Sequence, residues 1–353
     1  MSQMRAEIFE QPAALEKTLR REMRTFERLR RRFQARKPRL IVLAARGTSD
    51  NAAQFGRYLL EITTGIPVSL AAPSIFTLYN SSVDYKDALV VALSQSGEST
   101  DTNLVLERAR EQGAPTLGIT NEEESSLARL AEELVVVRAG REKSVAATKT
   151  YTGQLLTLYL LAWALGAPLA LDDLRRIPQW ASAALDLEKQ IIARTERYRF
   201  MNHSVVVGRG LNYSNAFEFA LKMMETCYVV AERFSSADFL HGPIAMVEQS
   251  FPVFMFAPAG VTWPPAKDMI GKLDALKAET MLITDRSNRE ASAGKHRTIC
   301  VPAKLVCRAC LPVELYTPIP YIIPAQLFAA TLAALKGLNP DQPRTLTKVT
   351  QTM

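Results

Sequence analysis

The amino-acid sequence predicts an α/β fold made of two similar units in tandem, each a doubly wound parallel sheet. Apolar runs of strand length alternate with helical patterns in both halves of the chain, as in parallel sheets covered by helices on both faces. A repeat supports this fold: residues 41–47 and 204–210 each run from an apolar strand into Arg-Gly and a polar turn, at an offset of 163 residues. Two copies of one unit account for both observations.

The order of the predicted elements follows from the apolar periodicity and its interruptions. In the first unit we expect strands over 40–45, 67–71, 88–93, 116–120 and 134–137, and helices over 51–64, 102–112, 125–130 and 148–165. In the second unit we expect strands over 204–208, 228–231, 252–256, 280–284 and 298–301. Residues 167–168 and 172–178 indicate a boundary between them, followed by a linking helix near 180–198. The predicted organisation is an N-terminal helical segment (1–37), a first unit (38–178), a second unit (195–336) and an extended C-terminal tail (337–353).

The N-terminal helical segment is strongly basic. Residues 17–39 contain eleven Lys or Arg, in a chain of net charge +7. Leu15, Leu19, Met23 and Phe26 recur at steps of three and four, which predicts an amphipathic helix with a basic outer face. Because no aromatic platform or nucleic-acid motif accompanies it, we expect a solvated or subunit-contacting helix and no nucleic-acid partner.

The composition is that of a protein with a substantial core. Hydrophobic residues make up 48% of the chain and charged residues 22%. We expect no uncharged apolar run of about 18 residues, and hence no membrane partner. The N-terminus lacks the basic-then-apolar layout of a signal peptide, so a cytoplasmic location is expected.

The most informative stretch is Ser94-Gln95-Ser96-Gly97-Glu98-Ser99-Thr100-Asp101-Thr102, where a predicted strand turns into a helix. It contains five hydroxyls and one glycine. Backbone N–H groups and the positive end of the helix dipole meet at such a turn, and hydroxyls add donors without adding charge. The stretch therefore predicts a site for the phosphate of a small molecule. The alternative is an ordinary capped helix, since Ser and Thr are common caps.

A second polar turn, Gly47-Thr48-Ser49, follows the first predicted strand. Ligands of open parallel sheets bind beyond the carboxyl ends of the strands, and both turns fall at such ends. Gly47 permits a tight turn and a close approach of the backbone to a ligand. We expect Ser49 to share the ligand with the Ser94 loop.

Further motifs follow in order along the chain. They are Val145-Ala146-Ala147-Thr148-Lys149, Ala220-Leu221-Lys222-Met223-Met224-Glu225, His241-Gly242-Pro243 and Asp341-Gln342-Pro343-Arg344-Thr345-Leu346-Thr347-Lys348. With the two turns, this ordered set resembles the double sugar isomerase (SIS) family, which includes the isomerase half of glucosamine-6-phosphate synthase and stand-alone glucosamine-6-phosphate deaminases. The resemblance runs from about residue 40 to the C-terminus and implies two flavodoxin-like SIS units.

The resemblance also implies binding residues for a sugar phosphate. The residues matching this binding site are Gly47, Thr48, Ser49, Ser94, Gln95, Ser96 and Ser99. The main chain near Val145 and Ala146 matches the part that contacts the sugar.

Four side chains match catalytic residues of the family. Glu225, beside Lys222, corresponds to the base that moves a proton between C1 and C2. His241 matches the residue that assists ring opening and that, in the family, reaches across from the partner subunit of a homodimer. Lys348 resembles the tail lysine that meets the open-chain carbonyl.

These residue types suit aldose–ketose chemistry. A partly buried carboxylate can move a proton between adjacent carbons, a histidine titrates near neutrality, and a desolvated lysine can attack a carbonyl. From spacing alone other interpretations stay open. Glu225 lies three residues from Lys222 and so can be its surface ion-pair partner, His241 can be a loop histidine, and Lys348 a solvated tail lysine.

The sequence departs from the synthase pattern in two places. The synthase begins with a glutaminase domain and a nucleophilic cysteine, whereas the first cysteine here is Cys227. We therefore expect a deaminase that converts glucosamine 6-phosphate to fructose 6-phosphate and ammonia without hydrolysing glutamine. A fructosamine-phosphate deglycase, a galactosamine 6-phosphate deaminase and a non-enzymatic phosphosugar sensor are the alternatives. The second departure, Ser236-Ala237-Asp238-Phe239-Leu240 before His241, bears on the substrate.

The late cysteines raise the question of a metal. His296, Cys300, Cys307 and Cys310 include a Cys-x2-Cys spacing, which can bind zinc. Because Cys300 lies on a predicted strand, whose alternation places its neighbours on both faces, we expect inert thiols. The resemblance likewise implies no metal and no other cofactor.

Overall fold

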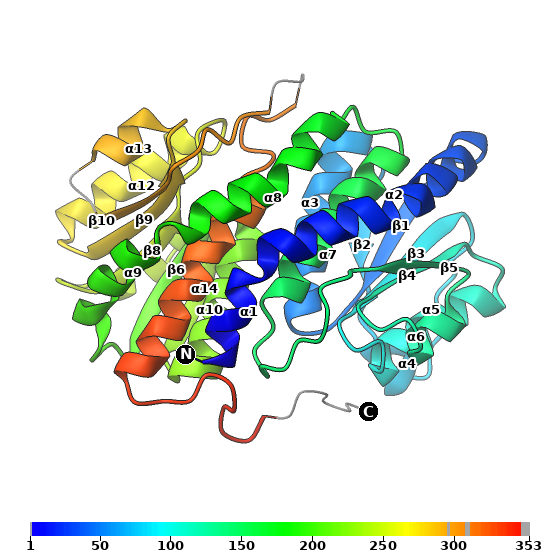
Figure 1. The fold of residues 1–353 in the computed structure, drawn as a ribbon, viewed down its shortest axis with the longest axis horizontal. Helices are drawn as coiled ribbons and strands as arrows, with labels where there is room; N and C mark the ends of the chain where they lie inside the picture. The colour runs from blue at the N-terminus through cyan, green and yellow to red at the C-terminus, as the bar shows by residue number, and fades with distance from the viewer. Residues whose placement is uncertain (1, 295–296, 308–310, 347–353) are drawn as a thin grey trace. The chain divides into compact units, whose positions relative to one another are not determined.

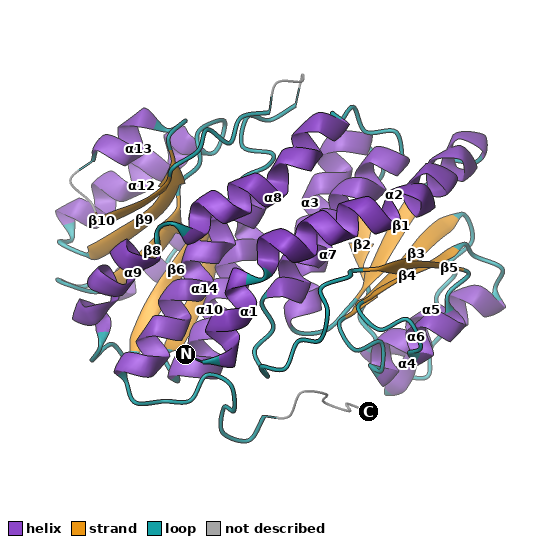
Figure 2. Ribbon diagram, in the orientation of Figure 1, coloured by secondary structure: helices purple, strands orange, loops and turns teal. Residues whose placement is uncertain are grey.

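Two parallel five-stranded sheets with flanking helices make up the protein (Figures 1 and 2). The structure is a computed structural model that describes residues 2–294, 297–307 and 311–346. The predicted class, α/β with two tandem doubly wound units, is confirmed. In the described part, Ala13–Glu142 and Lys149–Arg175 form one compact unit, here called the β1–β5 unit. Met1–Pro12, Lys143–Thr148 and Arg176–Thr345 form the other, the β6–β10 unit.

The sheet of the β1–β5 unit has the order β2-β1-β3-β4-β5 and is parallel throughout. Its strands are β1 (Leu40–Ala44), β2 (Val68–Leu70), β3 (Ala88–Ser94), β4 (Thr116–Thr120) and β5 (Glu133–Val136). Central strand β3 is buried along its whole length, as its uninterrupted apolar run requires. The order reverses between β1 and β3, so the loops after these strands flank the crevice where doubly wound sheets bind ligands.

Helices cover both faces of this sheet. They are α3 (Thr48–Thr64), α4 (Ser74–Thr77), α5 (Thr100–Glu111), α6 (Ser126–Leu130) and α7 (Lys149–Ala164). Val105 and Leu106 of α5 pack with Val90 of β3 in one buried cluster. Between α3 and α7, the rings of Phe55 and Tyr159 meet edge to face at 5.0 Å.

The sheet of the β6–β10 unit has the order β10-β9-β8-β6-β7. Its strands are β6 (His203–Gly208), β7 (Val230–Ser235), β8 (Pro252–Phe256), β9 (Glu279–Asp285) and β10 (Arg297–Val301). Taken along the chain, this is the same topology as the first sheet, which confirms the internal repeat. The strand expected over 228–231 begins two residues later, because Tyr228 has a left-handed φ of 53° and ends the preceding helix.

The helices of this unit complete the repeat. They are α10 (Tyr213–Cys227), α11 (Ser236–Leu240), α12 (Trp263–Ala275), α13 (Arg289–Ala293) and α14 (Pro318–Leu335), with 3-10 turns at Glu196–Tyr198, Gly210–Asn212 and Pro243–Met246. Helix α14 packs against α10, α9 and α1. The expected absence of a membrane-length apolar run is wrong for α14. Among the described residues it is the one helix long and apolar enough to cross a membrane by length and composition, but 83% of it is buried. A helix enclosed on all sides is apolar on all sides.

Four helices lie outside the two repeated patterns. They are α1 (Gln3–Phe9), α2 (Gln11–Ala35), α8 (Leu171–Leu185) and α9 (Glu188–Thr195). The boundary expected over 172–178 falls inside α8, which continues through Pro178, and the two compact units divide within this helix, after Arg175. The single linking helix expected near 180–198 is likewise the end of α8, then α9 and a 3-10 turn.

The basic face of α2 is partly neutralised within the β1–β5 unit. Arg28 and Arg32 pair with Glu133 and Glu132 at 2.6 and 2.8 Å. Such exposed pairs contribute at most about 1 kcal/mol each, so they orient the helix more than they stabilise it. These contacts give part of the basic face a partner inside the chain itself.

Candidate functional site

The loop between β3 and α5, here called the Ser94–Thr100 loop, is shaped by its own hydroxyls and by one glycine. The Ser94 hydroxyl accepts from the Gly97 N–H at 3.0 Å, and the Ser96 hydroxyl accepts from the Glu98 N–H at 3.2 Å. Gly97 has φ +69°, and a Cβ there would lie 2.1 Å from the Ser125 hydroxyl oxygen. Only glycine fits this turn without displacing Ser125.

The carbonyl groups of the loop are tied back to the protein. The Gly97 oxygen accepts from the Asn103 side chain at 3.1 Å and from the Leu127 N–H at 2.9 Å. The Gln95 oxygen accepts from the Thr120 hydroxyl at 3.3 Å. Because the negative ends of these peptide dipoles are already bonded, the loop is suited to an anion.

Ser99 occupies the N-cap of α5 but does not act as an ordinary cap. Its side chain makes no capping hydrogen bond, and its hydroxyl lies 3.1 Å from the Thr102 hydroxyl instead. A normal N-cap serine accepts from a backbone N–H of the first turn. The geometry therefore favours an anion site over the capped-helix alternative.

The turn after β1 is joined to the same helix. Gly47 has φ +56° and precedes α3, and the buried Ser49 hydroxyl accepts from the Gln154 side chain at 2.9 Å. The Arg46 guanidinium donates to one carboxylate oxygen of Asp101 at 2.7 and 3.1 Å. Asp101 lies in the first turn of α5 and its side chain is only 4% exposed. This ion pair was not predicted, although the Arg-Gly that ends the first strand is its signal in the sequence.

Glu98, the acidic residue of the loop, points to α6. Its carboxylate accepts from both the hydroxyl and the N–H of Ser126, at 2.7 and 2.9 Å. These hydrogen bonds to the charged form lower the pKa of Glu98. The negative charge is thereby held by α6.

In the β6–β10 unit, Lys222 lies between two carboxylates of α10. Its ammonium nitrogen is 2.7 Å from Glu225 and 3.4 Å from Glu218. The side chains of Lys222 and Glu218 are 1% and 0% exposed, whereas that of Glu225 is 23% exposed. A buried ammonium needs such partners, since an isolated buried charge is very costly. Glu225 is thus the member of the trio that a substrate can reach; Glu218, one helical turn before Lys222, was missed by the sequence reasoning.

The remaining predicted residues are found in the same unit or beyond the described part. His241 ends α11 and is exposed, and its N–H donates to the Asp238 carbonyl at 3.1 Å. Among the described residues its imidazole has no hydrogen-bond partner. The Val145 N–H donates to the Asp341 carbonyl at 3.3 Å, and Ala146 is buried. Lys348 lies outside the described residues.

The predicted site residues are divided between the two units. The β1–β5 unit contains the predicted phosphate binders Gly47, Thr48, Ser49, Ser94, Gln95, Ser96 and Ser99. The β6–β10 unit contains Val145, Ala146, Lys222, Glu225 and His241.

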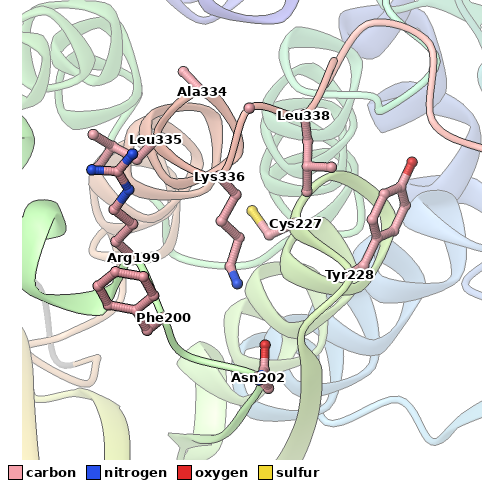
Figure 3. A pocket seen from close by; sticks show the side chains of 10 residues that line it. Arg199, Phe200, Asn202, Cys227, Tyr228, Ala334, Leu335, Lys336 and Leu338 are labelled. Atoms are coloured by element: carbon pink, nitrogen blue, oxygen red, sulfur yellow. The ribbon is translucent and has the colours of Figure 1, made fainter.

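A pocket of about 650 Å³ opens where α10 and α14 end (Figure 3). Cys227, Tyr228 and Lys336 contribute to its lining. The Tyr228 hydroxyl accepts from the Arg344 N–H at 2.8 Å, and the Arg344 guanidinium lies 3.9 Å from the centre of the Tyr228 ring. A wall of this pocket thus anchors the C-terminal segment that leads to Lys348.

The described cysteines are not arranged as reactive groups. Burial raises the pKa of Cys227 to about 11 and also raises that of Cys300. Cys307 is buried, and His296 and Cys310 lie outside the described residues. Across the described part of the chain, no group of three or more His, Cys, Asp or Glu side chains is placed to hold a metal ion.

Comparison with known proteins decides the family. A family model described as SIS domain matches residues 35–164 and 200–336. The chain belongs to the SIS domain family. A curated relative of this SIS protein, glutamine–fructose-6-phosphate aminotransferase (isomerizing) of Pyrococcus horikoshii, is 33% identical over 98% of the chain and 57% of its own length. The chain spans little more than half the length of such relatives.

Solved structures agree with this assignment. The C-terminal domain of glucosamine-fructose-6-phosphate aminotransferase from Francisella tularensis has a TM-score of 0.84 and 27% identity, over 97% of this chain and 98% of that domain. Glucosamine-6-phosphate deaminase from Thermotoga maritima has a TM-score of 0.78 and 21% identity, over 99% of this chain and 100% of that chain, which speaks for the fold alone.

Proposed function

We propose that this SIS protein is an amino-sugar phosphate deaminase that converts glucosamine 6-phosphate to fructose 6-phosphate and ammonia. The observation that carries the proposal is the trio on α10, in which the partly exposed Glu225 is held 2.7 Å from the buried Lys222 ammonium. A fixed carboxylate on the accessible side of a buried cation is suited to proton transfer between adjacent carbons.

The proposed reaction assigns a role to the Ser94–Thr100 loop, to Glu225 and to Lys222. The Ser94–Thr100 loop binds the phosphate through its N–H groups and hydroxyls. Glu225 accepts the proton from C2 of the open-chain aldose and returns it to C1, while a proton passes from the C2 amine to the C1 oxygen. These transfers leave a hydroxyl at C1 and an imine at C2. Water then adds to C2, and ammonia departs to give the ketose. Lys222, bonded to Glu225, orients the carboxylate during both proton transfers.

We also carry the family's use of His241 into the proposal, with the imidazole acting in the site of a partner subunit of a homodimer. Its exposure, and the absence of a bonding partner for it among the described residues, support this role. An imidazole can both donate and accept a proton, as the acid or base for ring opening must.

The names of the relatives are consistent with this substrate class. The Pyrococcus relative is named for amino transfer to fructose 6-phosphate, and the Thermotoga neighbour is named a glucosamine-6-phosphate deaminase. The described cysteines, with the pKa of Cys227 raised to about 11 by burial, do not favour thiolate chemistry such as glutamine hydrolysis.

The direct test is ammonia release from glucosamine 6-phosphate in the absence of glutamine. We expect ammonia and fructose 6-phosphate in equal amounts, and a loss of about 10²- to 10⁴-fold in Glu225→Gln, the range for removing a general base. Glu232→Gln is the matched control, because Glu232 is an exposed carboxylate on β7 of the same unit. Turnover that survives Glu225→Gln would show that the base is wrongly assigned. Thermal stabilisation by the sugar phosphate without ammonia release would exclude the deaminase and favour a deglycase or a sensor.

A further inference from the structure

The main chain of Lys143–Thr148, here called the 143–148 loop, is held at four points by residues distant in sequence. The N–H groups of Lys143 and Ser144 donate to the two carboxylate oxygens of Glu7 at 2.5 and 3.2 Å. The Val145 N–H donates to the Asp341 carbonyl at 3.3 Å. The Thr148 carbonyl accepts from the Gln326 side chain at 3.3 Å. This loop contains Val145 and Ala146, the predicted contacts to the sugar.

Glu7 makes the strongest of these contacts with the loop. It lies on α1 and is completely buried, and it also accepts from the Gln3 side chain at 3.1 Å. A buried carboxylate is stable only when strong donors surround it, and hydrogen bonds to a charged acceptor are about twice as strong as neutral ones. Both carboxylate oxygens of Glu7 accept from backbone N–H groups of the loop.

Asp341 links α1 to the same loop from the other end of the chain. Its carboxylate oxygens accept from the N–H groups of Gln3 and Met4, each at 2.7 Å, and so cap the N-terminus of α1. Its carbonyl is the acceptor for Val145. Three residues later, Arg344 is anchored on Tyr228.

We propose that Glu7 and Asp341 are positioning residues that set the main chain of the 143–148 loop for contact with the sugar. The proposal rests on the proposed function for its substrate, but not for its geometry. Both residues lie outside the ranges 35–164 and 200–336 that match the SIS family model. Helix α1 and the C-terminal segment are thus parts of the proposed binding apparatus. Asp341, whose carbonyl accepts from Val145 of the loop, lies on the same C-terminal segment as Lys348.

Hydrogen exchange tests the geometry without any substrate. In Glu7→Gln, one carboxylate oxygen is replaced by an NH₂ group that faces a backbone donor. We expect peptides covering 143–148 to exchange about 10- to 100-fold faster, the range for losing a hydrogen bond to a charged group. Glu10→Gln, an exposed carboxylate just after α1, is the matched control. Unchanged exchange of the 143–148 peptides in Glu7→Gln would show that Glu7 does not fix this loop. Exchange that becomes equally faster in α14 would show a general loss of stability instead, and would also overturn the proposal.

Kinetics then tests the functional consequence. In Glu7→Gln we expect KM for glucosamine 6-phosphate to rise about 10-fold or more, with little change in inhibition by inorganic phosphate, which probes the phosphate loop alone. A purely structural defect would change both. Faster exchange with an unchanged KM would refute the positioning role. If Glu7→Gln fails to fold, Asp341→Asn, which keeps the carbonyl bond to Val145 but weakens the cap of α1, is expected to show the same pattern more mildly. If the wild-type protein does not use this sugar, the hydrogen-exchange result still shows whether Glu7 fixes the main chain of the 143–148 loop.

Discussion

Replacing Gly97 by alanine should damage the Ser94–Thr100 loop by an amount that can be worked out from its surroundings. The residue has φ +69°, and the added Cβ would lie 2.1 Å from the Ser125 oxygen and 2.4 Å from its Cβ. The left-handed backbone costs about 1–2 kcal/mol for a residue with a Cβ. Overpacking adds about 1–3 kcal/mol. We expect Gly97→Ala to lower the free energy of unfolding by about 2–5 kcal/mol.

Relieving the overlap should disturb the Ser94–Thr100 loop whichever side moves. The Ser125 hydroxyl donates to the Glu122 carbonyl at 2.8 Å and accepts from the Ala128 N–H at 3.3 Å, so it caps α6. Moving Ser125 breaks both bonds, and moving the loop instead breaks the bonds that the Gly97 carbonyl accepts from Asn103 and Leu127. Phosphate affinity should therefore fall together with stability, and calorimetric titration with inorganic phosphate and urea unfolding measure the two effects.

Gly113→Ala is the matched control at the other end of α5. Gly113 has φ +74° but open space where its Cβ would be placed. It should therefore lose about 1–2 kcal/mol from backbone strain alone and keep phosphate affinity. If both variants lose the same stability and Gly97→Ala binds phosphate normally, the close contact with Ser125 does not govern the loop and the reasoning fails.

Three further predictions concern single groups. Ser126→Ala should raise the pKa of Glu98, because hydrogen bonds from Ser126 lower it. The wild-type protein should then be more stable than the variant above the unfolded-state pKa of Glu98, and this difference should fade as the pH falls through the folded-state pKa. NMR titration curves of Glu98 that coincide in the two proteins would contradict this. Mixing inactive Glu225→Gln and His241→Ala dimers under exchange should restore about a quarter of wild-type deaminase activity if His241 serves the partner's site, and none if it serves its own. Cys227, with its pKa raised to about 11 by burial, should resist iodoacetamide at pH 8 in the native protein, as mass spectrometry would report.

The elements that position the Ser94–Thr100 loop were predictable because their signals are local. The apolar run that forms β3, the hydroxyl-rich turn and the amphipathic pattern of α5 are contiguous in sequence. Each follows from the physical properties of neighbouring residues. The predicted ends of elements were less accurate where a single backbone dihedral angle determines them. The positive φ of Tyr228 ends α10, so that β7 begins later than predicted.

The contacts that hold the site together were not predictable from one sequence. Arg46 and Asp101 are 55 positions apart, Glu7 and Lys143 are 136, and Gln3 and Asp341 are 338. No spacing rule connects such pairs, since they depend on the tertiary fold. The family resemblance marked the motif around Asp341 as significant, but not that its carboxylate would cap α1.

A comparison of corresponding turns in the two repeated units shows how their surroundings for an anion differ. Both sheets have a glycine with positive φ between the third strand of the repeat and its following helix, Gly97 after β3 and Gly260 after β8. Around Gly97 the turn offers hydroxyls, whereas the turn at 257–260 reads Ala-Pro-Ala-Gly. The space beside Gly260 is occupied by the buried carboxylate of Glu314, whose oxygen would lie 2.0 Å from an added Cβ. A buried carboxylate repels a phosphate in a low-dielectric setting. Of the two corresponding turns, the one in the β1–β5 unit therefore presents hydroxyls where the one in the β6–β10 unit has the Glu314 carboxylate.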